Sequence, residues 1–429
     1  MNTFLLLAGR STRFWPLTEK TLFPLCGKTL LEHQVNRLKE GGCENIILVG
    51  SAHNLDEARQ KLPDLPTVQQ ENLELGMRGA VLSILKEYGN DPLMIVGGND
   101  VIEPRAYTEL LNSTGDGALL AYKVDRYFPG GYLSTDGDRI TGIVEKPGEG
   151  NEPSDLVNVV AHVHRDPAAL SAALSDIDES TDDGYEQALT KLFADKHYTA
   201  VQYDGVWQAV KYPWHLVDLC EVLLDEIPQQ KIDSTAEIHP SADIIGNVVI
   251  AAGAKVLHNA VIRGPAYIGK NTIVANNALV RGSSVGDNCV VGFSTEVKGS
   301  VLHSHVWTHM NYIGDSVIGS NVSFGGGAIT GNFRLDEEEV VSSCKEAKIA
   351  TGRTKFGCVI GNDCRIGVHV STNPGVKIGA GCFIATATFV TTDIEDGKFV
   401  MMKNGVIDLR ENRTKSSTPS DREELRKKL

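Results

Sequence analysis

The C-terminal half of this 429-residue chain repeats an apolar residue every six positions, which limits its fold more than any other feature. An amphipathic helix needs a period of 3.6 residues and a plain strand a period of two, so neither explains it. A six-residue period predicts a parallel β-helix, whose stacked coils bury one apolar stripe. The repeated positions are Ile250, Val256, Ile262, Ile268, Val274, Val280; Val285, Val291, Val297; Val301, Trp307, Ile313; Ile318, Phe324; and Ile360, Ile366, Thr372, Ile378, Ile384, Val390.

Cysteine and histidine residues within the repeat resemble metal sites, but the period gives them simpler explanations. Cys364 and Cys382 are eighteen residues apart, which is one coil of three faces, so they stack about 4.8 Å apart on one face. We expect them to be small buried side chains. His303 and His309 are six residues apart and therefore lie on different faces. We expect no metal at either place.

Residues 331–356 interrupt the repeat for too long to form a simple turn. Long excursions in compact folds are usually functional or disordered. The segment predicts either an anion-binding element or a solvated face, because it carries Arg334, Lys345, Lys348, Arg353 and Lys355.

The first 228 residues alternate apolar runs with amphipathic stretches, two of which end in glycine as helices often do. Uniformly apolar strands that alternate with helices are typical of a parallel sheet covered on both faces. The expected strands are 3–8, 44–50, 92–98 and 117–124, and the expected helices are 30–42, 76–89 and 214–227.

A chain of this length is expected to form two domains, and the change of period indicates where they meet. We expect an α/β domain over 1–228, a linker over 229–240 and the β-helix over 241–403. The tail, 404–429, is expected to be solvated, with the sequence SDRE offering a capping box for one short helix.

Composition excludes several classes of protein. The formal charge is −14, from 41 basic and 55 acidic residues, which argues against nonspecific nucleic-acid binding. We expect neither a membrane span nor a secretory signal, because the chain has no run of about 18 apolar residues and no basic start with a cleavage motif. Eight cysteines without a Cys-x-x-Cys pair are typical of reduced thiols, so we expect a cytoplasmic protein.

A short basic loop near the N-terminus contrasts with this acidic background. The segment LAGRSTRFWPLTEK, residues 7–20, follows the first expected strand and places Arg10, Arg13 and Lys20 around Gly9. Backbone N–H groups at the end of a strand can hold phosphate, and basic side chains can neutralise it. The loop therefore predicts an anion site.

This loop resembles the signature of the sugar-1-phosphate nucleotidylyltransferases, a short Gly-rich loop that ends in Thr-Arg and is followed by a catalytic lysine. The resemblance implies a Rossmann-like domain with a mostly parallel sheet. It implies that Arg13 and Lys20 are catalytic, and that a sugar phosphate attacks the α-phosphorus of a nucleoside triphosphate with loss of pyrophosphate. The loop residues that would hold the triphosphate are Ala8, Gly9, Ser11 and Thr12.

Further motifs match the same family in order along the first 228 residues. By this resemblance Gln70 or Gln69 reads the base together with Gly76, and Asp100 in GGNDV binds Mg²⁺. The sugar-binding positions would be Gly131, Glu145, Lys146 and Asn158.

The chain departs from the family pattern at four positions. Ser11 stands for a second glycine, Met77 for a threonine and Asn99 for a glycine. The largest departure is Ala209, which stands where relatives have the aspartate or asparagine that completes the Mg²⁺ site. Alanine cannot coordinate a metal, but a cation held by one carboxylate can keep several waters.

The segment HMNYIGD, residues 309–315, resembles the acetyl-transfer motif of bifunctional glucosamine-1-phosphate acetyltransferase/N-acetylglucosamine-1-phosphate uridylyltransferases. That family joins a nucleotidylyltransferase domain to a left-handed parallel β-helix and usually forms trimers with acetyl-CoA between neighbouring helices. The resemblance implies that His309 is the base, since imidazole titrates in the required range. It implies sugar-phosphate contacts from Arg281, Lys298, Tyr312, Asn332 and Lys355, and contacts to acetyl-CoA from Gly326 and Ala385.

Together these features predict a homotrimeric enzyme that acetylates a hexosamine 1-phosphate and transfers a nucleoside monophosphate, most simply from UTP, to the product. Its partners would be small molecules, with Mg²⁺ as cofactor and acetyl-CoA as co-substrate. Two alternatives stay open. One activity could be lost, or both folds could form a non-catalytic regulatory or assembly subunit.

Overall fold

The structure is a computed structural model that describes residues 1–426 except 8, 10, 179–182 and 346. Ala8 and Arg10, two of the expected phosphate-loop residues, lie outside the described residues. The chain forms two compact units, Met1–Arg10 with Leu30–Ala209 and Ser11–Thr29 with Val210–Leu429. The segment that carries Arg13 and Lys20 therefore belongs to the same unit as the C-terminal half.

A nine-stranded sheet forms the centre of the first unit, in the order β5-β4-β1-β6-β11-β8-β12-β10-β9. The predicted strands are present, and β5, β4, β1 and β6 are parallel as expected. The other half is mixed, because β11 runs antiparallel to both β6 and β8. The strands are β1 (Asn2–Leu6), β4 (Asn45–Gly50), β5 (Thr67–Gln69), β6 (Leu93–Gly97), β8 (Gly117–Lys123), β9 (Gly131–Asp136), β10 (Arg139–Glu145), β11 (Leu156–His164) and β12 (Tyr198–Tyr203), with a separate pair β7 (Asp100–Ile102) and β13 (Trp207–Ala209).

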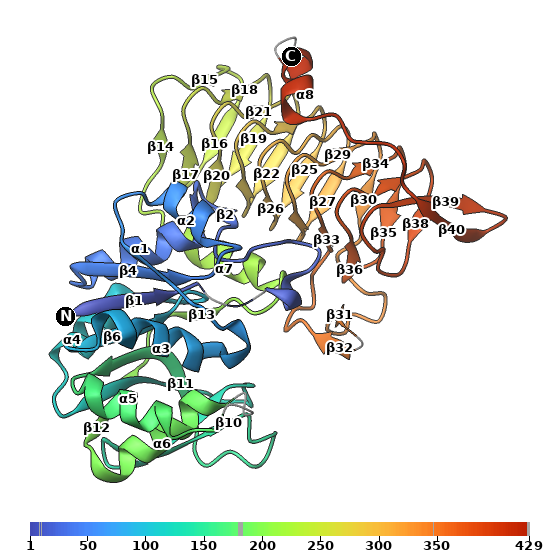
Figure 1. Cartoon of the computed structure of the whole chain (residues 1–429). Helices are drawn as coiled ribbons and strands as arrows, with labels where there is room; N and C mark the ends of the chain where they lie inside the picture. Colours follow the sequence, from blue (N-terminus) through green and yellow to red (C-terminus); the bar gives the residue numbers. More distant parts are fainter. Residues whose placement is uncertain (8, 10, 179–182, 346, 427–429) are drawn as a thin grey trace. The chain divides into compact units, whose positions relative to one another are not determined.

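Helices cover both faces of this sheet, as its apolar strands predict. α3, α5 and α6 bury their apolar sides in one cluster with the strands, whereas α1 and α4 pack against each other (Figure 1). The helices are α1 (Leu30–Glu40), α2 (Leu55–Lys61), α3 (Gly76–Tyr88), α4 (Pro104–Asn112), α5 (Pro167–Ser175) and α6 (Gly184–Asp195). No helix among the described residues is long and apolar enough to cross a membrane.

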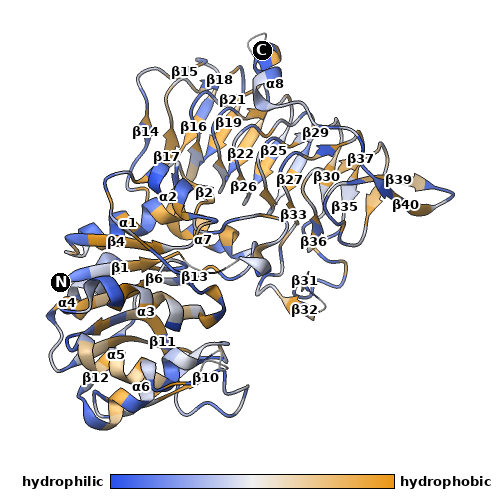
Figure 2. Cartoon of the chain, viewed as in Figure 1, coloured by the Kyte–Doolittle hydropathy of each residue, from blue (hydrophilic) through white to orange (hydrophobic). Residues whose placement is uncertain are grey.

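The six-residue repeat forms a parallel β-helix, in which three sheets follow one another around each coil (Figures 1 and 2). The first sheet contains β14 (Lys231–Ile232), β17 (Val248–Ile250), β20 (Ala266–Ile268), β23 (Ser284–Val285), β26 (Val301–Leu302), β28 (Val317–Ile318), β33 (Cys358–Ile360) and β36 (Val376–Ile378). The second contains β16 (Asp243–Ile245), β19 (Val261–Arg263), β22 (Leu279–Arg281), β25 (Glu296–Lys298), β27 (Tyr312–Gly314), β30 (Ile329–Thr330), β35 (Ser371–Thr372) and β38 (Phe389–Val390). The third contains β15 (Glu237–Ile238), β18 (Lys255–Val256), β21 (Ile273–Val274), β24 (Val290–Val291), β29 (Ser323–Phe324), β34 (Arg365–Ile366), β37 (Phe383–Ile384), β39 (Lys398–Lys403) and β40 (Val406–Glu411).

Shorter elements complete the second unit. β2 (Pro24–Leu25) pairs with β3 (Lys28–Thr29), and the excursion forms a second small pair, β31 (Val341–Cys344) and β32 (Ala347–Ala350). The helices are α7 (His215–Asp225) and α8 (Pro419–Arg426).

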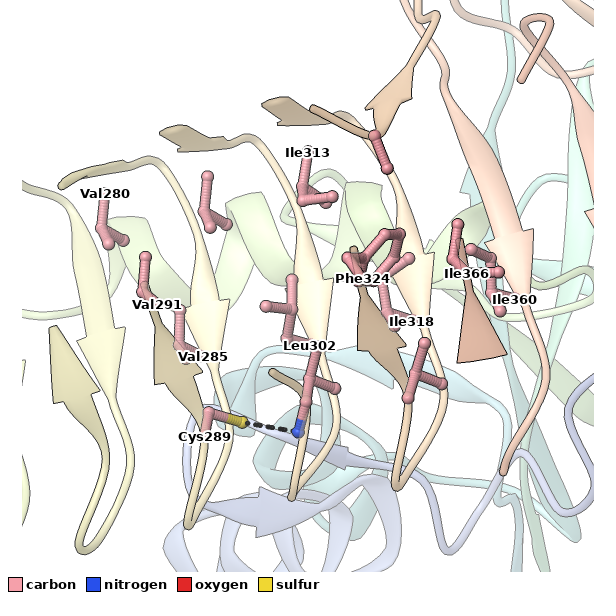
Figure 3. Close-up of a cluster of buried hydrophobic side chains, with 14 of the residues drawn as sticks. Val280, Val285, Cys289, Val291, Leu302, Ile313, Ile318, Phe324, Ile360 and Ile366 are labelled. Carbon is pink, nitrogen blue, oxygen red and sulfur yellow. Dashed lines mark hydrogen bonds between the residues drawn. The ribbon is translucent and has the colours of Figure 1, made fainter. Parts of the chain in front are cut away.

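The inward positions of the coils follow the predicted register, with one correction. Figure 3 shows Val280, Ile313, Ile318 and other predicted positions pointing into the interior of the coils. The prediction is wrong by one residue at Val301 and Trp307, because Leu302 pairs with Val285, and Trp307 bridges to Val290. Leu302 is therefore the inward residue, whereas Trp307 packs under the guanidinium of Arg422, 4.1 Å from its ring centroid.

Cys364 and Cys382 are buried in this core, as predicted. Among the described residues no group of three or more His, Cys, Asp or Glu side chains could hold a metal ion.

Both ends of the β-helix extend beyond the expected bounds. The expected linker, 229–240, contains β14 and β15, which pair with the next coil. The tail also differs from the expectation, because Arg365 donates to the carbonyl of Ser417 and α8 places Arg422 against the coils. The capping box of α8 is formed by Thr418 and Asp421, whose side chains accept from each other's backbone N–H, rather than by SDRE.

Candidate functional site

The first unit contains a cavity of about 200 Å³ at the N-terminal end of α3, lined by Gln70, Gly76, Met77, Asn99 and neighbouring residues. Gln70 is buried, and its Nε2 donates to the carbonyls of Asn72 and Gly76 at 2.9 and 2.8 Å. Its Oε1 is buried without a hydrogen-bond partner among the described residues. Gln69 is exposed, and of the two glutamines only Gln70 is among the residues that line this cavity.

Asp100 lies on β7, directly opposite Ala209 on β13. Its carboxylate accepts a hydrogen bond from Trp207 Nε1 at 3.0 Å and lies 3.4 Å from Asn99 Nδ2. Mg²⁺ prefers oxygen ligands and is often bound through one or two carboxylates together with substrate phosphates and water. Asp100 therefore fits a Mg²⁺ held largely by phosphate and water, and does not fit a site made of several protein carboxylates.

The expected sugar-binding residues of the first unit lie on the antiparallel part of the sheet. Gly131 pairs with Glu145 across β9 and β10, and a Cβ at Gly131 would lie 3.1 Å from Glu145 Oε2. The Lys146 ammonium forms an ion pair with the Glu145 carboxylate at 2.9 Å. Asn158 lies on β11 and is hydrogen-bonded to His162 at 2.9 Å. Because residue 131 is a glycine, no side chain crowds the Glu145 carboxylate on the opposite strand.

The expected phosphate loop is divided between the two units. Gly9 and Asp100 belong to the first unit, whereas Ser11, Thr12, Arg13 and Lys20 belong to the second. Ser11 has a φ of 46°, in the left-handed region that favours glycine, which gives a physical reason for the glycine of the family pattern. Arg13 is exposed, and the half-buried Lys20 donates to the carbonyl of Val210 at 3.5 Å.

The second unit contains a larger cavity, of about 620 Å³, beside the β-helix. Arg263, Arg281 and Lys298 form a column along one wall, because they are paired in register on three consecutive coils. Arg353 and Lys355 add two further cations from the excursion. The lining contains five basic side chains and three acidic ones, so it carries a positive excess in a strongly acidic protein.

Carboxylates pair with some of these cations. Arg281 is bonded to Glu296 at 2.8 Å, and Arg353 is bonded to both Asp218 and Glu221 of α7. Among the described residues no carboxylate pairs with Arg263 or Lys355, and Lys355 lies 5.7 Å from the ring centroid of Phe333. In these two places, unlike at the paired cations, no carboxylate of the described residues would compete with a bound anion.

A polar cluster around Asp315 forms one end of this site. Lys298 Nζ lies 2.6 and 2.7 Å from the two carboxylate oxygens of Asp315, whose side chain is only 3% exposed. Asn332 Nδ2 donates to the same carboxylate and to the Tyr312 hydroxyl, 3.1 Å away. Burial raises the pKa of Tyr312, so its hydroxyl stays protonated. The structure thus brings Lys298, Tyr312 and Asn332 together, as expected.

His309 lies at an exposed turn of the coil and is not part of the cavity wall. Its backbone N–H donates to Asn311 Oδ1, and a Cβ at Gly326 on the next coil would lie 3.6 Å from His309 Cδ2. Gly326 is therefore adjacent to His309. Ala385 lies farther along the β-helix, where its N–H donates to the carbonyl of Val400.

Two residues of this site, Asp315 and Arg263, were missed from the sequence. Asp315 ends the motif HMNYIGD, so its place there could have marked it. Arg263 and Arg281 are eighteen residues apart, which is one coil, and this spacing could have identified Arg263. For Arg353, nothing in the sequence indicated its pairing with α7.

Comparison with known proteins agrees with both halves. Residues 2–213 match the family model described as nucleotidyl transferase, and residues 247–282 match that of the bacterial transferase hexapeptide, six repeats. The bifunctional sugar-1-phosphate nucleotidylyltransferase/acetyltransferase of Sulfurisphaera tokodaii is 30% identical over 407 residues, 93% of this chain and 99% of the relative. Bifunctional protein GlmU of Methanococcus vannielii is 32% identical over 426 residues, 95% of this chain and 99% of the relative.

GlmU of Methanocaldococcus jannaschii is 30% identical over 414 residues, again 95% of this chain and 99% of the relative. These relatives match across both units and not only over one of them. The parallel coils agree with the parallel β-helix predicted from the repeat and are consistent with the left-handed form that the family resemblance implies. The chain therefore belongs to the bifunctional sugar-1-phosphate nucleotidylyltransferase/acetyltransferases, enzymes that combine sugar-1-phosphate nucleotidyl transfer with acetyl transfer.

Proposed function

We propose that this enzyme acetylates a hexosamine 1-phosphate on the β-helix and transfers UMP from UTP to the product through residues of the first 228 positions. The observation that carries the proposal is the positive excess in the cavity beside the β-helix, where Arg263 and Lys355 have no carboxylate partner among the described residues. A phosphate monoester is the ligand class that such a pocket favours, since its two charges match fixed cations. Arg281 and Lys298 would complete the phosphate contacts.

Acetyl transfer requires a neutral amine, and His309 is the proposed base. The sugar ammonium gives a proton to the imidazole, and the amine then attacks the thioester carbon of acetyl-CoA. The carbon–sulfur bond breaks, and the nitrogen gives its second proton to the thiolate, which leaves as free CoA. The imidazolium then releases the first proton to solvent. Tyr312 and Asn332 would orient the sugar, while Gly326 and Ala385 would allow the co-substrate close to the coils.

Nucleotidyl transfer requires a base pocket, a Mg²⁺ site, a sugar site and cations for the transferring phosphate, and we propose first-unit residues for the first three of these. Gln70 Oε1 lacks a donor among the described residues, and the N3–H of uracil would supply one. Arg13 and Lys20 would neutralise the transferring phosphate, with Gly9, Ser11 and Thr12 holding the triphosphate. Gly131, Glu145, Lys146 and Asn158 would bind the sugar. Asp100 would bind a Mg²⁺ that, when present, neutralises phosphate charge.

Replacing Gln70 with methionine should raise KM for UTP by about tenfold or more, because a buried hydrogen bond to the base is lost. Steady-state pyrophosphate release at varied UTP measures this. The matched control is Gln69→Met, which changes the exposed neighbour and should leave KM unchanged. An equal effect of both variants would remove Gln70 from the base site.

Replacing Ala209 with aspartate should increase the affinity for Mg²⁺, since it places a second carboxylate opposite Asp100. Without metal the two like charges should lower thermal stability, and added Mg²⁺ should restore it. Melting curves at varied Mg²⁺ measure this, with Ala209→Asn as the uncharged control. A midpoint that responds to Mg²⁺ no more than in the parent would contradict the assignment of Asp100.

Two parallel assays test the proposal as a whole. One measures pyrophosphate release from UTP, dTTP and GTP with N-acetylglucosamine 1-phosphate, and the other measures thiol release from acetyl-CoA with glucosamine 1-phosphate. We expect both to be active and UTP to be preferred. Activity in one assay alone would support the loss of one chemistry, and activity in neither would support a non-catalytic subunit.

Assembly and location remain predictions. The proposed trimer would cover exposed apolar side chains beside His309, namely Phe293 and Met310, which are 44% and 53% exposed. The eight cysteines are all free thiols, which suits the reducing cytoplasm that we expect.

A further inference from the structure

A buried chain of hydrogen bonds runs from Asn158 into the interior of the first unit. His162 Nε2 lies 2.9 Å from Asn158 Oδ1, and His162 Nδ1 lies 2.9 Å from the Tyr185 hydroxyl. His164 continues the chain, with Nε2 3.0 Å from the Tyr185 hydroxyl and Nδ1 2.8 Å from the Tyr198 hydroxyl. Both imidazoles are fully buried, and the two tyrosines are each 1% exposed. The proposed reaction uses only the first member of this chain.

A β-bulge in β11 explains how Asn158 and His162 can meet. Along a regular strand, residues four apart are separated by about 13 Å, too far for a hydrogen bond. In β11, however, Val159 pairs with Leu120 and His162 pairs with Leu119, so three steps on β11 match one step on β8. The bulge shortens the distance along β11 and brings the His162 imidazole within hydrogen-bond distance of the Asn158 amide. This irregularity therefore serves the contact between the two side chains.

The protonation of the chain is limited by burial. Burial lowers the pKa of His162 well below its ordinary value and that of His164 to about 3, so both imidazoles are neutral. A neutral imidazole has one N–H and one acceptor nitrogen, and a phenol has one proton to donate. Each ring consequently donates one hydrogen bond. The backbone carbonyl of Val159 is a further acceptor for His162. Along the side-chain contacts the protons point either all toward Tyr198 (inward) or all toward Asn158 (outward).

Counting protons selects the outward direction. If the protons pointed inward, Tyr198 would accept from His164, and its own buried O–H would have no acceptor among the described residues. If they point outward, Tyr198 donates to His164 Nδ1 and His164 Nε2–H donates to Tyr185. Tyr185 then donates to His162 Nδ1, and His162 Nε2–H donates to Asn158 Oδ1. Every proton has an acceptor, as buried polar groups require.

We infer that this chain fixes the orientation of the Asn158 amide, so that Oδ1 faces His162 and Nδ2 is left to donate to an acceptor oxygen of the bound sugar. His162, Tyr185 and His164 are then positioning residues, which act on the substrate only through Asn158. The inference rests on the proposed role of Asn158 in sugar binding. It also says which way the hydrogen bond to the sugar runs: Asn158 Nδ2 donates, so the site selects a sugar oxygen that can accept a hydrogen bond.

Replacing Tyr185 with phenylalanine tests the chain, because His162 loses its donor and can take the other tautomer, which lets the Asn158 amide turn over. We expect KM for N-acetylglucosamine 1-phosphate to rise about three- to tenfold in the presence of UTP and Mg²⁺, while KM for UTP stays unchanged. The matched control is Tyr107→Phe, since the Tyr107 hydroxyl is equally buried but has no partner among the described residues. That variant should leave both KM values unchanged.

Replacing Asn158 with aspartate separates the inference from the proposed function. The carboxylate can still accept from His162 Nε2–H but offers no donor to the sugar, so KM for the sugar phosphate should rise about tenfold or more. No effect of Asn158→Asp would refute the sugar role of Asn158. A large effect of Asn158→Asp together with identical values for Tyr185→Phe and Tyr107→Phe would overturn the orienting chain and leave the sugar role intact.

The tautomers themselves provide a test that needs no variant. The ¹⁵N chemical shifts of labelled histidine in the whole protein distinguish a protonated from an unprotonated ring nitrogen. We expect both buried imidazoles to carry the proton on Nε2 and to stay neutral as the pH is lowered to 5. A proton on Nδ1 of either ring, or a charged ring at that pH, would overturn the inference.

Discussion

Replacing His309 with alanine is expected to lower the rate of acetyl transfer by a factor of about 10² to 10⁴, the range that general-base catalysis contributes. Nucleotidyl transfer should stay at the parent rate, because the residues proposed for it lie elsewhere in the chain. His309 is exposed and bonds to Asn311 only through its backbone, so the substitution should not disturb the coil. Thiol release and pyrophosphate release from the same preparation measure the two rates.

The matched control for this experiment is His258→Ala, which removes another exposed histidine from a turn of the β-helix. It should change neither rate. Equal loss of both activities in His309→Ala would contradict separate sites, and a parent rate of acetyl transfer would remove His309 as the base.

Replacing Lys298 with alanine is expected to have the second-largest effect, because it should damage both binding and folding. Removing the ammonium leaves Asp315, 3% exposed, without its charge partner. Lys298 itself is 22% exposed, so we expect a loss of about 2 kcal/mol in the free energy of unfolding, less than for a fully buried pair. Acetyl transfer should fall at least tenfold through a raised KM for glucosamine 1-phosphate.

The double variant Lys298→Ala with Asp315→Asn separates these two losses. Without a buried carboxylate the coil no longer contains an uncompensated charge, so denaturant unfolding should recover most of the lost stability. Acetyl transfer should not recover, since the phosphate-binding cation is still missing. If activity returned together with stability, Lys298 would be a structural partner of Asp315 and would have no role in binding the sugar phosphate.

The sequence predicted the β-helix well because its period is long and repeated. One apolar residue in six identified the inward positions on most coils, and Cys364 and Cys382 behave as that period requires. The errors at Val301 and Trp307 arose where a coil is shortened. The apolar Trp307 fits the pattern, but it bridges to Val290, one position before the inward Val291. At the other position two adjacent apolar residues, Val301 and Leu302, both fit the pattern. Only the pairing of Leu302 with Val285 decides between them.

Other parts of the molecule depend on contacts between distant segments, which no local pattern encodes. The residues of β11 are as apolar as those of a parallel strand, so its sequence does not show its direction. Only its pairing with β6 and β8 shows that it is antiparallel. Arg353 looked like one of five cations in an excursion, yet it alone among them binds both Asp218 and Glu221 of α7. The capping box lies two residues before SDRE, because Thr418 and Asp421 satisfy the same rule.

The placement of residues 11–29 has a consequence for how the two activities can be separated by evolution or by cloning. The N–H of Cys26 donates to Ser284 Oγ at 2.9 Å, and the ring of Phe23 packs edge-on against His303, so this segment is anchored on the coils. A fragment cut after residue 228 would keep Arg13 and Lys20 but lose the surface that shapes their loop. With the roles proposed for Arg13 and Lys20, nucleotidyl transfer would therefore depend on the coils that anchor residues 11–29, and we expect such a fragment to be less active than the whole chain.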